Sequence, residues 1–278
     1  MFFRRLEYMV HWRAAFALAV LYGGLLAVQS CSVKEDRSEC PCMLTLDFSD
    51  VDYELLREAG LTEMGIIVSS ESEICVRKSV SIKEAPGECV VAVPRSLVNM
   101  CAVCGDGGDW KDSSVVVDEG EECPKYYVGL DSFDACRDAM TRKVVLHKNH
   151  CILTVRLKNS YGVPSRRFSV TAEGDVCGFD MYGDLVAGTF KACSEESFGG
   201  ACSVCLPRQR DGSLSLQILF PDSGDIRSFP LGDYILQSGY DWNASDLEDI
   251  DVEVDFSLTG VSFTIDTWKK TLYFEIRF

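Results

Sequence analysis

A cysteine near the amino end, Cys31, stands where its thiol could receive a covalent group after export. Three arginines lie within the first 13 residues, and the following stretch, residues 14–33, carries no charge. Basic residues keep the amino end inside the cell while an apolar run enters the export channel. The small residue Ser30, directly before the cysteine, suits a protease pocket. We therefore predict cleavage between Ser30 and Cys31, and attachment of a glyceryl thioether to the Cys31 thiol.

Residues 25–31 resemble the lipobox of bacterial lipoproteins, although Gln29 stands where a small residue is usual. A diacylglyceryl group plus an amide-linked chain holds a protein at a membrane, whereas one acyl chain binds only marginally. Two alternatives stay open. The first is an uncleaved membrane anchor, since the uncharged stretch is long enough to span a bilayer. The second is a plain secretory signal, which would be cleaved without lipidation. We expect residues 1–30 to be a lipoprotein signal peptide and residues 31–42 a lipidated tether.

The charge of the chain limits its partners. Its 278 residues carry a formal net charge of −16, and removal of residues 1–30 would leave about −18. No lysine- or arginine-rich run remains after that removal. Such a surface repels nucleic acid and anionic membrane surfaces. We therefore expect an acidic exported protein with no nucleic-acid partner.

Cysteines are unusually frequent in this chain. There are 14, of which 13 remain when Cys31 is set aside. In an oxidising compartment so many favour disulfides, and an odd number leaves at least one thiol free or paired between molecules. Cys101 with Cys104 and Cys202 with Cys205 have the C-x-x-C spacing that zinc sites and redox centres also use. Both pairs lie in β-type sequence, which favours a structural role, and the connectivity does not follow from the sequence.

Alternation of apolar and polar residues is the main pattern after the tether. Cys151, Leu153 and Val155 point to one side of an extended segment, while Thr154 and Arg156 point to the other. This alternation is typical of a strand with one face on a core. Further strands are predicted at residues 43–48, 61–68, 88–93, 115–117, 167–172, 179–190, 213–220, 225–229, 252–256, 261–265 and 272–278.

Many short strands separated by turn residues indicate an all-β fold. We predict two tandem antiparallel β-sandwich domains, an N-terminal one over residues 43–145 and a C-terminal one over residues 146–278. Each is long enough to bury its own core. A short helix is predicted within residues 51–59, and residues 131–140 are predicted to be helical or irregular.

Few residues beyond the signal region are arranged for chemistry. His147 and His150 would send their rings to opposite faces of a strand, which argues against a metal pair. The aspartates of loop 105–109 could hold calcium. The acidic residues 246–251 after Ser245 favour a capped helical turn over a paired-carboxylate site. HExxH, nucleophile-elbow and phosphate-loop motifs do not occur, so we predict no catalytic residue, no metal and no cofactor.

Four stretches, taken together, resemble one protein family in their order and spacing. They are residues 36–46, residues 150–157, residues 206–216, and residues 229–250 with the valine-rich acidic strand that follows. The chain resembles the FimB/Mfa-type fimbrial anchor lipoproteins, which belong with the transthyretin-like pilins of anaerobic gut and oral bacteria. The resemblance spans nearly all of the chain after the signal region and is densest after residue 145. The number of cysteines departs from the family pattern.

This resemblance implies a structural role. It implies two transthyretin-like sandwiches held by lipid on Cys31, which tether the base of a fimbrium at the outer membrane, exposed on the cell surface. The partners would be fimbrial pilin subunits, joined by strand exchange. Residues 34–36 resemble the charged signal that routes such lipoproteins to the surface.

Two alternatives to the anchor stay open. One is a minor or tip adhesin of the same fold. The other is a lipid-tethered module that binds a glycan or calcium, in which Trp110, Trp242 and Trp268 would supply an aromatic platform unless they fill the core.

Overall fold

The computed structural model describes residues 40–105, 113–158, 166–198, 200–255, 261–267 and 270–276. Within these ranges it contains nineteen strands and two short helices. The segment Cys40–Phe278 is assigned to one compact unit. The prediction of a mainly β protein is therefore confirmed.

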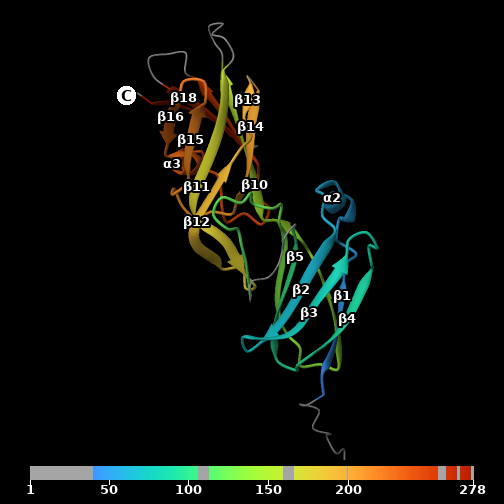
Figure 1. Ribbon diagram of the computed structural model, residues 1–278. Coiled ribbons are helices and arrows are strands. Elements are labelled where there is room, and N and C mark those ends of the chain that lie inside the picture. Colours follow the sequence, from blue (N-terminus) through green and yellow to red (C-terminus); the bar gives the residue numbers. More distant parts are fainter. Residues whose placement is uncertain are drawn as a thin grey trace, which may run out of the picture. The chain divides into compact units, whose positions relative to one another are not determined.

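Two sheets contribute to a first cluster of buried side chains, which includes Leu44, Ile66, Val91 and Met100. One sheet has the order β4 (Glu88–Val93), β1 (Cys42–Asp47), β8 (Ala139–Lys143). The other has the order β3 (Glu73–Ser81), β2 (Glu63–Ser70), β5 (Leu97–Cys104), β7 (Tyr127–Asp134), β9 (His147–Lys148). Figure 1 shows β3, β2 and β5 side by side. Every second side chain of β1 and of β4 belongs to this cluster, as expected for strands with one buried face.

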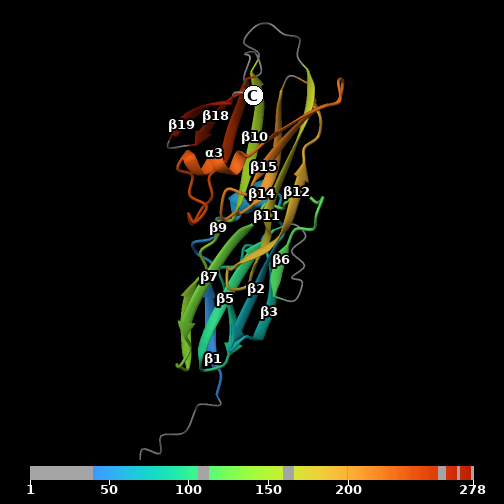
Figure 2. The same cartoon turned by 90° about the vertical axis from the view of Figure 1, so that its left-hand side faces the viewer.

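Two further sheets contribute to a second cluster, which includes Leu153, Phe168, Leu216 and Val252. One has the order β14 (Ala201–Pro207), β10 (His150–Lys158), β17 (Ile250–Asp255), β18 (Val261–Thr267), β19 (Lys270–Ile276) (Figure 2). The other has the order β12 (Leu185–Cys193), β11 (Arg167–Asp180), β15 (Ser215–Phe220), β16 (Asp225–Phe229), and both β6 (Ser114–Val116) and β13 (Ser197–Phe198) pair with β11.

Strand β5 is buried on both faces and touches both clusters. Met100, Ala102 and Cys104 belong to the first cluster, whereas Cys101 and Val103 belong to the second. Burial on both faces explains why β5 is almost continuously apolar instead of alternating. A single strand thus contributes side chains to both clusters, and the division into two domains at residue 145 stays a prediction.

Most neighbouring strands are antiparallel, but two pairs are parallel. β1 runs parallel to β8, and β10 runs parallel to β17. The expectation of purely antiparallel sheets is wrong for these pairs. Parallel neighbours need a long crossover, and several other strands separate each pair along the chain. The hairpin of β17 and β18 is confirmed, with Val252 opposite Ile265.

The predicted short helix is present as α2 (Tyr53–Glu58). Asp52 caps it by accepting a hydrogen bond from the Leu55 N–H at 3.0 Å. Gly60 follows with a φ of 87°, a left-handed conformation that glycine adopts without steric cost.

The structure differs from the local predictions in three places. Residues 131–140 are not helical, because β7 continues to Asp134 and β8 starts at Ala139, and only residues 135–138 are irregular. The strand predicted at residues 179–190 is broken by a turn at Gly183, where φ is 88° and Asp180 accepts from two backbone N–H groups. Helix α3 (Leu231–Gln237) was not predicted. It follows Pro230 without a side-chain cap, so the usual start signal is missing.

Candidate functional site

The residues predicted to be cleaved and lipidated, Ser30 and Cys31, lie outside the described residues, and so do most of loop 105–109 and Trp110. Their roles stay predictions. Across the ranges that the structure describes, no helix has the length and apolar character needed to cross a membrane. The same ranges contain no group of three or more His, Cys, Asp or Glu side chains that could hold a metal ion.

Residues 147–152, here called the crossing segment, pass from one sheet to another. β9 pairs with β7, whereas β10 pairs with β14 and β17. Asp246 accepts a hydrogen bond from the Lys148 N–H at 2.7 Å. Asp249 Oδ1 accepts from Lys148 Nζ at 2.6 Å and from the Ile152 N–H at 2.8 Å. These carboxylates supply partners at the point where the backbone changes sheets.

The loop that carries these carboxylates, residues 240–249, is called the acidic loop. Arg208 binds the backbone of this loop. The Arg208 guanidinium donates to Ala244 O at 2.8 Å, to Ser245 O at 3.2 Å and to Trp242 O. It also donates to Asn149 Oδ1, in the crossing segment, at 2.6 Å. A planar guanidinium with five donors can bind several oxygens at once, which lysine cannot reproduce. Burial lowers the pKa of Arg208 from its ordinary value.

Three of the four stretches that carry the family resemblance meet here. Arg208 comes from the third stretch and the acidic loop from the fourth, while the crossing segment leads into the second. The hydrogen-bonded partners are 34 to 101 residues apart in the chain. Local spacing could not have predicted that these side chains come together.

The capped helical turn predicted for residues 246–251 is wrong. In the acidic loop, residues 242–246 form turns and bends and residues 247–249 are irregular, and β17 begins at Ile250. The physical reason is that Asp246 and Asp249 are hydrogen-bonded to the crossing segment, so they are not free to cap a local helix. Trp242 is 2% exposed, so it lies in the core and does not form an aromatic platform.

His147 and His150 have different partners. The His147 Nδ1 lies 3.0 Å from Asp246 Oδ2. The His150 Nδ1 donates to Tyr126 O at 3.0 Å, and its ring meets Tyr127 edge-on at 5.4 Å between centroids. His150 is 1% exposed, and this burial lowers its pKa. His150 therefore packs as a neutral ring whose tautomer is set by the Tyr126 carbonyl.

The thirteen described cysteines are all free thiols, so the disulfide framework expected from their number is not formed in this structure. Cys101 and Cys104 face different clusters, since positions i and i+3 of a strand point to opposite sides. Burial raises the pKa of each of these two thiols to about 12. A buried thiol with so high a pKa is a poor nucleophile, so this C-x-x-C pair has a packing role.

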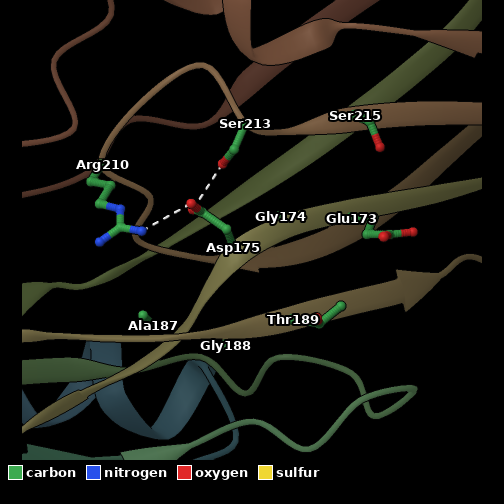
Figure 3. Close-up of a pocket in the computed structure, with 9 residues that line it drawn as sticks. All are labelled: Glu173, Gly174, Asp175, Ala187, Gly188, Thr189, Arg210, Ser213 and Ser215. Atoms are coloured by element: carbon green, nitrogen blue, oxygen red, sulfur yellow. Dashed lines mark hydrogen bonds and ion pairs between the residues drawn. The ribbon is translucent and has the colours of Figure 1, made fainter.

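A polar groove of about 550 Å³ lies over β11, β12 and the residues before and at the start of β15. Its lining residues are Glu173, Gly174, Asp175, Ala187, Gly188, Thr189, Arg210, Ser213 and Ser215 (Figure 3). Asp175 accepts hydrogen bonds from Arg210 Nη2 at 3.0 Å and from Ser213 Oγ at 2.8 Å. The bond from Arg210, followed by that from Ser213, lowers the pKa of the Asp175 carboxyl.

The groove is formed where β11 is irregular. The register between β11 and β12 shifts between Gly174 and Val176, and again between Val176 and Gly178. Such bulges bend a strand and re-aim its side chains. The nine lining residues offer carboxylates, hydroxyls and a guanidinium but no aromatic ring. The groove can therefore hydrogen-bond a polyhydroxylated ligand, without a surface on which a sugar ring could stack.

The comparisons with known proteins place the fold. No family model and no curated protein sequence matches the chain. A candidate polysaccharide-binding protein from Bacteroides thetaiotaomicron matches with a TM-score of 0.60 at 12% identity, over 85% of this chain and 98% of that one. A candidate adhesin from the same organism matches with a TM-score of 0.55 at 16% identity, over 86% and 98%.

A third structure is the fimbrial anchor protein Mfa2 from Porphyromonas gingivalis. It matches with a TM-score of 0.54 at 11% identity, over 86% of this chain and 99% of that one. The resemblance seen in the sequence is thus confirmed at the level of the fold, which this chain shares with a fimbrial anchor and a candidate adhesin.

We predict that Arg208→Ala lowers the free energy of unfolding by about 1–3 kcal/mol, because the carbonyls of the acidic loop lose their donor. Arg208→Lys should recover only part of this stability, since one ammonium group cannot bind as many carbonyl oxygens as the guanidinium does. Arg210→Ala is the matched control, because Arg210 lies on the surface in an exposed ion pair and its loss should change little. Urea unfolding of the three variants measures the effect, and equal losses for Arg208→Ala and Arg210→Ala would contradict it.

We also predict that stability falls as the pH drops below about 6.5, the ordinary value for histidine. The pKa of His150 is lowered in the folded state, so the unfolded chain takes up a proton that the buried ring does not, and acid favours unfolding. Burial is the main cause, Lys148 and Lys125 act in the same direction, and the Tyr126 carbonyl and Asp249 oppose it.

Unfolding free energies measured across this pH range should show a shallower dependence for His150→Gln than for the unsubstituted protein. His147→Gln serves as the control and should retain the slope that His150 causes. An unchanged slope in His150→Gln would show that another group is responsible.

Proposed function

We propose that this chain is an exported lipoprotein that anchors or assembles a fimbrium at the outer membrane. The observation that carries the proposal is the likeness in fold to the fimbrial anchor protein Mfa2, which extends over 86% of this chain and 99% of that one. The basic, apolar and lipobox-like sequence before Cys31 supports a membrane tether.

In this proposal the lipid on Cys31 fixes the amino end to the membrane, and the tether of residues 31–42 leads to the folded part. The folded part then presents its sheets to fimbrial pilin subunits. β3, β12, β16 and β19 each end a path of paired strands. Such edges carry backbone N–H and C=O groups that can pair with an extended segment of another subunit. Strand exchange of this kind needs no catalytic group, which agrees with the structural role proposed.

A second candidate function is favoured by the polar groove. One structure of similar fold is a candidate polysaccharide-binding protein, and the groove offers two carboxylates, Glu173 and Asp175, with Arg210 and several hydroxyls. A surface adhesin that binds a glycan through these groups would need no pilin partner.

We predict that Cys31→Ala releases the protein, and any fimbriae attached to it, from the outer membrane into the medium. The variant lacks the thiol that accepts the glyceryl group, so neither lipidation nor stable anchoring follows. Cys40→Ala is the matched control, because Cys40 is an exposed cysteine that the lipobox does not include. Cell fractionation and immunoblotting measure the distribution, and retention of Cys31→Ala on the membrane would disprove the tether.

The anchor and the glycan-binding adhesin predict different partners. Cross-linking on intact cells followed by purification should recover a ladder of fimbrial subunits bound to the protein if it is an anchor. Binding to a saccharide array that is lost in Asp175→Asn and kept in Asp211→Asn, with no fimbrial subunit recovered, would instead favour the adhesin.

A further inference from the structure

Two cysteines from distant parts of the chain meet at one carbonyl oxygen. Cys123 precedes β7, and Cys205 lies in β14. The Cys123 thiol donates a hydrogen bond to Pro124 O at 3.4 Å, and the Cys205 thiol approaches the same oxygen at 3.9 Å. The Cys205 side chain is also the main influence that raises the pKa of the Cys123 thiol. Their sulfur atoms are therefore neighbours, although 81 residues separate Cys205 from Pro124.

The surroundings give this pair a route to solvent. Cys123 and Cys205 are 2% and 5% exposed, and both line a cavity of about 400 Å³. Lys125 and Ser203 line the same cavity, so its wall is partly polar. A small disulfide can enter such a space, or a brief local opening can present either sulfur to a larger one.

Nearby cysteines are engaged elsewhere. Cys202, three positions before Cys205 on β14, donates to Phe168 O at 3.5 Å and lies 3.6 Å from Glu195 O. Cys151 is fully buried beside the Tyr240 side chain. Among the described residues, Cys123 and Cys205 are the two thiols that share one acceptor, Pro124 O.

We propose that Cys123 and Cys205 form a disulfide when the protein meets a disulfide oxidant. The thiolate of one cysteine attacks the oxidant's S–S bond, which forms a mixed disulfide and expels one thiolate. The second cysteine, after losing its proton, attacks the protein sulfur of the mixed disulfide and expels the other thiolate. The two cysteines are oxidised by two electrons, and the oxidant is reduced to two thiols that take up the released protons.

Two consequences follow from the surroundings of the pair. The neighbouring Cys205 side chain, together with burial, raises the pKa of the Cys123 thiol. Thiolate is the reactive form, so oxidation should be slow at neutral pH and faster in alkali. Once formed, the bond would join the segment before β7 to β14, and would stabilise the fold because it restricts the unfolded chain.

The test uses purified, fully reduced protein exposed to oxidised glutathione. We expect a reducible peptide linking Cys123 to Cys205 to appear in the mass spectrum, whereas exposed cysteines such as Cys193 should carry glutathione instead. The oxidised protein should also unfold at a higher urea concentration than the reduced one. Because this assay uses an added oxidant, it does not depend on the proposed fimbrial role or on export.

Two variants and one control make the assignment specific. Cys123→Ser and Cys205→Ser should each abolish the linked peptide and the gain in urea midpoint. Cys193→Ser, at an exposed cysteine of β12, should leave both unchanged. Comparing all variants in the reduced state shows whether the serine itself disturbs the fold. Recovery of Cys123 and Cys205 as separate alkylated peptides after oxidation, or a link between other cysteines, would overturn the proposal.

Discussion

The structure depends on the hydrogen bonds that hold the crossing segment where it leaves one sheet and enters another. A strand that changes sheets loses its regular backbone partners, and buried backbone groups need replacements. Asp249 binds the Ile152 N–H and the Lys148 ammonium together, and Asp246 binds the Lys148 N–H. Arg208 fixes the loop that presents both carboxylates. With these bonds in place, β10 can lie between β14 and β17, and the second cluster can close around Leu153.

Much of the fold could be predicted from local pattern. The alternation of Cys151, Leu153 and Val155 placed β10 correctly, and all three side chains are fully buried. The hairpin of β17 and β18 could also be predicted, because the alternation of its strands and the turn residues between them are local features of the sequence. The parallel pairing of β1 with β8, and of β10 with β17, could not be predicted. Strands so far apart in the chain carry no local sequence signal of which strand they will pair with.

The contacts of the candidate site were harder to predict from the sequence than the fold. Asp246 and Asp249 carry the composition of a helix start, yet their partners lie about a hundred residues away. The thiols of Cys123 and Cys205 share no spacing motif, whereas the C-x-x-C pair of Cys101 and Cys104 is split between two clusters. In each case tertiary contacts outweigh the local signal, and only the assembled sheets reveal which residues are neighbours.

A fold shared with a fimbrial anchor and the predicted lipid site on Cys31 together support a tethered structural subunit. In this proposal the lipid anchors the protein in the membrane, and the sheets bind neighbouring fimbrial subunits. The most direct measurement is mass spectrometry of the amino-terminal peptide of the protein isolated together with outer-membrane fimbriae. The account predicts a peptide that begins at Cys31 and carries diacylglyceryl and amide-linked acyl groups. A peptide that retains residues 1–30, or one that begins elsewhere without lipid, would contradict it.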